Sequence, residues 1–101
     1  MDHQTFEKIF YHQVETCANV LVEKGREYAT EDRLHNFRVA AALQGCTPAQ
    51  ALAGFLAKHI VSIYDLVQRD EVTMAQWDEK IGDALNYLFL LKAVVSEGVV
   101  E

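Results

Sequence analysis

The most informative segment of the chain is Trp77-Asp78-Glu79-Lys80-Ile81-Gly82-Asp83-Ala84-Leu85-Asn86-Tyr87-Leu88-Phe89-Leu90-Leu91-Lys92. Glu79, Asp83 and Asn86 recur at i, i+4 and i+7, which places three oxygen-bearing side chains in one row on a helix. Apolar residues occupy most of the remaining surface of that helix. Because an unpaired buried charge is costly, the two carboxylates must be paired, metal-bound or protonated. The segment therefore predicts the most buried helix of the protein, with a polar row that needs partners.

The rest of the chain is also predicted to be helical. One Pro and five Gly occur in 101 residues, and no alternating runs of β-branched residues are present. This length fits one domain, so residues 1–101 are expected to form a single all-α unit. Helices are expected over about residues 4–24, 34–43, 48–68 and 74–96, giving a four-helix bundle-like fold with three longer helices and one short one.

Composition limits the classes of partner. The net charge of −6 argues against nucleic-acid binding, which needs a basic patch. No apolar run approaches the ~20 residues that span a membrane, and no export signal precedes Cys17 and Cys46, so a reduced cytoplasmic setting is expected. Half of the residues are hydrophobic, which is high for so short a chain and predicts a homo-oligomer.

A second polar row lies on the helix expected at residues 48–68. Lys58, Ser62 and Asp65 occur at i, i+4 and i+7, and His59 is adjacent to Lys58. A short connector makes this helix an antiparallel neighbour of the helix at 74–96, which brings Asp65 near Glu79. Lys58 or Ser62 is then expected near Asp83 and Asn86. Asp65, Glu79 and Asp83 together predict an oxygen-rich site for Mg²⁺, which takes one or two carboxylates and the phosphates of a substrate.

A structural alternative explains the same two rows. Lys58 pairs with Asp83 or with Asp65, and Asn86 and Ser62 satisfy each other as part of a polar ladder between helices. His59 is then a core histidine rather than a ligand.

Residues 26–38 are the second candidate site. Arginines with forked donors suit phosphate, namely Arg26, Arg33 and Arg38. Rings for stacking a base and polar groups for its edge are also present, namely Tyr28, Phe37, Asp32, His35 and Asn36. The alternative is a solvated loop in which Phe37 is an anchor and Asn36 caps the following helix.

Residues 79–88, Glu-Lys-Ile-Gly-Asp-Ala-Leu-Asn-Tyr-Leu, resemble the last conserved helix of the MazG-like all-α nucleoside triphosphate pyrophosphohydrolases. That helix reads Glu-Leu-Gly-Asp followed by an apolar run. Residues 23–37 and 57–65 also resemble small phage and prophage proteins grouped near that family. The resemblance spans roughly residues 23–92.

The resemblance implies a dimer or tetramer that cleaves nucleoside triphosphates to the monophosphate and pyrophosphate. The family holds Mg²⁺ with a Glu-Glu-x-x-Glu motif and a Glu-x-x-Asp motif, and Asp83 matches the aspartate of the second. Lys80 stands where its glutamate is expected, with Glu79 one position earlier, and residues 58–62 stand where the first motif is expected.

Together, the two polar rows, the segment 26–38 and the resemblance lead to one hypothesis with separate roles for the site residues. Glu79 and Asp83 would be catalytic and would hold Mg²⁺ with Asp65. The groups expected to contact the nucleotide are Lys58, Asn86, Arg33 and Asn36. The replaced carboxylates leave a second hypothesis open, that of an inactive helical interaction module of phage or prophage origin.

Overall fold

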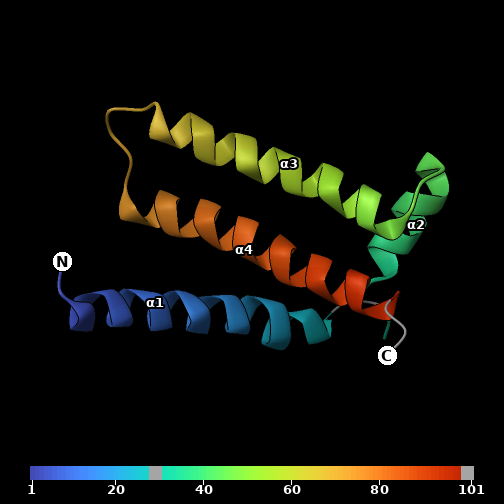
Figure 1. Cartoon of the computed structure of the whole chain (residues 1–101), viewed down its shortest axis with the longest axis horizontal. Helices are drawn as coiled ribbons and strands as arrows, with labels where there is room; N and C mark the ends of the chain where they lie inside the picture. The colour runs from blue at the N-terminus through green and yellow to red at the C-terminus, as the bar shows by residue number, and fades with distance from the viewer. Residues whose placement is uncertain (28–30, 99–101) are drawn as a thin grey trace.

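The computed structural model describes residues 1–27 and 31–98, which are helical without any strand (Figure 1). The described part contains four α-helices, one of them short: α1 His3–Ala18, α2 His35–Gln44, α3 Pro48–Val67 and α4 Met74–Glu97. The predicted all-α fold class is confirmed.

The starts of α3 and α4 follow from the same local chemistry. At α3, the Thr47 hydroxyl accepts from the Gln50 backbone N–H at 3.1 Å, and the Thr47 N–H donates to Gln50 Oε1 at 3.0 Å. Thr73 and Gln76 repeat both bonds at the start of α4. These capping boxes satisfy backbone donors that a helix end leaves open, so both starts are determined by sequence.

The first helix differs from the prediction at its end. The α-helix expected to reach residue 24 ends at Ala18 and continues as a π-helical turn, Asn19–Glu23, and a 3₁₀ turn, Lys24–Glu27. Asn and Val in the π-helical turn are weak helix formers. α2 ends as predicted at Gly45, whose φ of 66° is left-handed and suits glycine.

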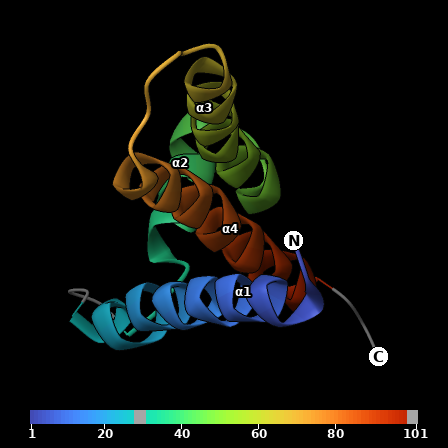
Figure 2. The same cartoon turned by 90° about the vertical axis from the view of Figure 1, so that its left-hand side faces the viewer.

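α4 is the central helix of the fold. α3 packs against one side of it as an antiparallel neighbour, and α1 packs against another side (Figures 1 and 2). The core lies among α2, α3 and α4 around Leu34, Phe37 and Leu52. The Phe37 ring meets the ring of Phe55 edge-on at 6.1 Å, so its predicted role as an anchor is confirmed.

The expected burial of α4 is wrong for one of its sides. Ile81, Leu88 and Phe89 are 38%, 47% and 54% exposed. The physical reason is that two neighbouring helices cannot surround a helix that is apolar over most of its circumference. No single described helix is long and apolar enough to cross a membrane, and α2 with α3 meets that test only as a pair bent by 100°.

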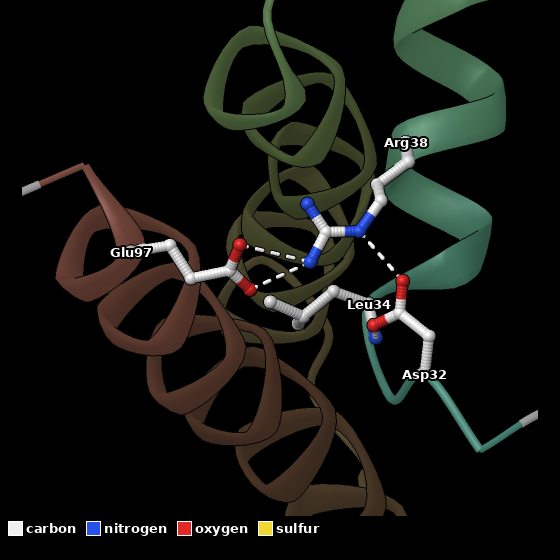
Figure 3. A network of polar contacts seen from close by, with 4 residues as sticks. All are labelled: Asp32, Leu34, Arg38 and Glu97. Atoms are coloured by element: carbon white, nitrogen blue, oxygen red, sulfur yellow. Dashed lines mark hydrogen bonds and ion pairs between the residues drawn. The ribbon is translucent and has the colours of Figure 1, made fainter.

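An arginine clasp joins the start of α2 to the end of α4 (Figure 3). Arg38 Nε donates to Asp32 Oδ2 at 2.6 Å, and Arg38 Nη2 donates to both Glu97 carboxylate oxygens at 2.7 and 2.8 Å. The Leu34 backbone N–H donates to the other Asp32 oxygen at 3.0 Å. The hydrogen bond from Arg38, followed by that from Leu34, lowers the pKa of Asp32 below its ordinary value.

This clasp predicts an acid-sensitive contribution to stability. Since the folded-state pKa of Asp32 is depressed, its contribution is fully present above the unfolded-state pKa of about 3.9 and is lost as the pH falls through the lower folded-state value. Asp32→Asn should therefore flatten the acid limb of a plot of unfolding free energy against pH, measured by urea denaturation. Asp70→Asn, in the exposed connector before α4, should leave that limb as in the wild type; parallel curves for all three proteins would contradict the prediction.

Candidate functional site

The polar row of α4 lines a cleft of about 150 Å³ between α4 and α1. α4 contributes Asp78, Glu79, Gly82, Asp83 and Asn86. The end of α1 and the turn after it contribute Thr16, Cys17 and Val20. The predicted row therefore lies together on one wall, but the opposite wall comes from α1 rather than α3.

Asn86 is the one buried polar residue of the described chain, at 9% exposure. Its Oδ1 atom has no hydrogen-bond partner among the described residues. The predicted polar contact between Asn86 and Ser62 is wrong. The Ser62 hydroxyl donates instead to the Lys58 carbonyl of its own helix at 3.1 Å. A buried acceptor without a partner costs about 1–3 kcal/mol, so this oxygen is available to a group that enters the cleft.

Asp83 connects the cleft to α3 through His59. His59 Nδ1 lies 3.7 Å from Asp83 Oδ2, too long for a hydrogen bond but close enough for an ion pair when the ring is protonated. The imidazole stacks on the Tyr87 ring with centroids 4.7 Å apart, so its position is fixed by packing. The ion pairs expected between Lys58 and either Asp83 or Asp65 are absent among the described residues. The basic side chain beside Asp83 is instead His59, which is half-buried.

The predicted metal ligands are only partly brought together. Glu79 and Asp83 share the cleft, whereas Asp65 is exposed on α3 and does not line it. Within residues 1–27 and 31–98, no group of three or more His, Cys, Asp or Glu side chains is placed to hold a metal ion. The carboxylates of Glu79 and Asp83 and the amide oxygen of Asn86 instead resemble the partial donor set of Mg²⁺, which keeps waters and takes phosphate ligands.

The segment before α2 does not contribute to this cleft. The Arg33 side chain rests on Gly25, since its Nε atom would lie 2.9 Å from a Cβ atom built there. Asn36 is exposed inside α2 and does not cap it, because the helix begins at His35 with Leu34 as the cap residue. Tyr28 lies outside the described residues. Arg33 and Asn36 as nucleotide contacts remain predictions.

The α1 wall was not predicted, although one signal for it exists. Gly82 lies inside α4, where glycine costs about 1 kcal/mol relative to alanine. A Cβ atom at this position would lie 3.4 Å from Gln13 Nε2 of α1, so Gly82 is on the side of α4 that faces α1. Gln13 Nε2 also donates to Cys17 Sγ at 3.6 Å, and Cys17 is buried, with 3% exposure.

Comparison with known proteins finds no matching family model, no matching curated protein and no matching solved structure.

Proposed function

We propose that the cleft between α1 and α4 binds Mg²⁺ together with the phosphates of a nucleotide. The chain is then a MazG-like nucleotide-binding protein that hydrolyses nucleoside triphosphates to the monophosphate and pyrophosphate. The observation that carries the proposal is the buried Asn86 Oδ1 atom, which has no partner among the described residues and lines a cleft with Glu79 and Asp83.

The chemistry and size of the cleft support a hydrated cation. Carboxylate and amide oxygens are the ligands that Mg²⁺ prefers in proteins. A volume of about 150 Å³ is well above the roughly 10–15 Å³ that one water needs, so the cleft has room for an ion with part of its hydration shell. Ligand pockets for whole small molecules are larger, about 300–1,000 Å³, so only the phosphates of a nucleotide would enter.

The residues of the cleft would then have separate roles. Glu79 and Asp83 would hold the ion, and Asn86 would supply a neutral oxygen that fixes the orientation of the group it binds. His59, fixed against Tyr87, would position the Asp83 carboxylate without touching the substrate. When bound, Mg²⁺ neutralises phosphate charge and makes a coordinated water more acidic. Lys58 and Asp65 lie outside the cleft lining and are not part of this proposal.

The test is release of pyrophosphate from a panel of nucleoside triphosphates with Mg²⁺ or Mn²⁺. Wild type is expected to be active, and Asp83→Ala is expected to lower the rate about 100-fold or more, since even residues that only support a metal ligand contribute 10–100-fold. Asp70→Ala, which removes an exposed carboxylate of the connector, is the matched control and should retain the wild-type rate. Equal rates for Asp83→Ala and wild type would overturn the assignment of the site.

The alternative function, an inactive interaction module, is favoured by a different observation. Large apolar side chains stay exposed on α1, α3 and α4, including Phe10, Tyr64 and Phe89 at 50%, 68% and 54%. Such a module would show no pyrophosphate release and no rise in melting temperature with Mg²⁺ or Mn²⁺, whereas a cation that binds the native state raises it.

A further inference from the structure

α3 has an uncovered apolar face. Figures 1 and 2 show α3 at an outer edge of the fold, on the side of α4 away from α1. Exposed apolar residues follow one another at helical spacing along this helix: Ala53, Ala57, Ile60, Val61, Tyr64 and Val67. We call these six residues the outer face of α3. Val61, Tyr64 and Val67 are 57%, 68% and 60% exposed, although an apolar helix face is normally covered by another element.

We propose that the outer face of α3 pairs with the same face of a second copy of the chain, in an antiparallel two-fold arrangement. This inference does not depend on the function of the cleft, since no residue of this face lines it.

The shape of the face is self-complementary only when the two helices run in opposite directions. Its first half carries Ala53 and Ala57, whereas its second half carries Val61, Tyr64 and Val67. A two-fold axis near Ile60 and Val61, at the middle of this face, places the bulky half of each copy on the small half of the other. A parallel pair would place the bulky halves together and leave a gap between the small halves, which costs packing contacts.

The charges on α3 give a second argument for the same arrangement. Only Lys58 and Asp65 carry a full charge between Pro48 and Val67, apart from the titratable His59. Both are exposed, neither makes an ion pair among the described residues, and seven residues of separation place them on the same edge of the helix. In the antiparallel pair, Lys58 lies opposite Asp65 of the partner subunit, and the two-fold axis repeats the contact.

The size of the face predicts a reversible dimer. A helix of 20 residues is about 30 Å long and about 10 Å wide. This footprint is smaller than the roughly 800 Å² per partner of a standard stable interface. We therefore expect a monomer–dimer equilibrium that responds to protein concentration.

The first test is sedimentation velocity of the full chain over a range of concentrations. Wild type is expected to shift from monomer to dimer, and Val61→Glu is expected to stay monomeric wherever wild type is dimeric, because it buries an unpaired charge at the interface. Leu43→Glu is the matched control: Leu43 is 82% exposed on α2, and this variant should dimerise like wild type. Circular dichroism checks that both variants remain helical. A wild-type protein that stays monomeric at all concentrations would overturn the proposal, and so would a dimeric Val61→Glu variant. A monomeric wild type that co-sediments with lipid vesicles would also overturn it, because the face would then bind lipid rather than a second copy.

A charge exchange tests the antiparallel geometry. Lys58→Glu and Asp65→Lys each place like charges at both edge contacts, so each variant alone should dimerise about tenfold more weakly than wild type. An equimolar mixture should recover dimerisation, because both edge contacts then join opposite charges. A mixture no tighter than the separate variants would overturn this arrangement.

Discussion

Replacing Asn86 with leucine is expected to raise the free energy of unfolding of the metal-free protein by about 1–2 kcal/mol. The Asn86 side chain is buried, and its Oδ1 atom has no partner among the described residues, so the folded state bears a desolvation cost that the unfolded state avoids. Leucine has the same branched shape with the same number of side-chain heavy atoms, and it removes that cost while burying apolar surface. Urea denaturation at equilibrium, in a chelating buffer, measures the change.

The same substitution should remove the response to cations. If Asn86 supplies an oxygen to a bound ion or its waters, the leucine variant should lose the rise in melting temperature with Mn²⁺ or Mg²⁺ and lose pyrophosphate release. Gain of stability with loss of binding is typical of a polar residue kept for function. Asn36→Leu, an exposed asparagine of α2, is the control and should change neither quantity beyond about 0.5 kcal/mol. A leucine variant at position 86 that keeps a full cation response would contradict the proposed site.

Leu52→Ala is expected to lower the free energy of unfolding by about 3 kcal/mol, within the range of 2–5 kcal/mol for such changes in cores. Leu52 is 0% exposed and belongs to the buried cluster with Leu34 and Phe37. The lost methyl groups forfeit transfer free energy, and the rings of Phe37 and Phe55, held edge to face, limit collapse into the cavity. Because a domain of this size has only about 5–15 kcal/mol of stability, the loss is a large fraction of the total.

The control for this change is Leu43→Ala on α2. Leu43 is 82% exposed, so the same chemical change there should alter the unfolding free energy by less than about 0.5 kcal/mol. Chemical denaturation of both variants, at equal protein concentration because of the proposed dimer, decides the comparison. Equal losses would mean that the buried cluster is not the main source of stability.

Local chemistry explains which parts of the fold were predictable. Thr47 with Gln50 and Thr73 with Gln76 satisfy the first backbone donors of their own helices, so each start depends only on nearby residues. The end of α1 does not have such a signal, and the change to a π-helical turn after Ala18 was not anticipated.

One wall of the candidate site was predictable from local sequence, and the other wall was not. The spacing of Glu79, Asp83 and Asn86 predicted one wall of the cleft, since periodicity places residues on a helix face whatever packs there. The opposite wall depends on which helix covers that face, and the short connector between α3 and α4 predicts α3 there rather than α1. α3 does approach Asp83 on one side, where His59 lies 3.7 Å from its carboxylate. On the side of the cleft, the neighbour of Asp83 is α1. Gly82 lies on the side of α4 that faces Gln13 of α1.

The position of α1 has a consequence for access to the cleft. α1 packs on the described bundle mainly through α4, so the helix–helix contact that closes the cleft is also what holds α1 in place. Entry of a ligand from that side and detachment of α1 are then one event, described by one local opening free energy. Any substitution that loosens α1 should make the cleft easier to enter and its bound state costlier to maintain.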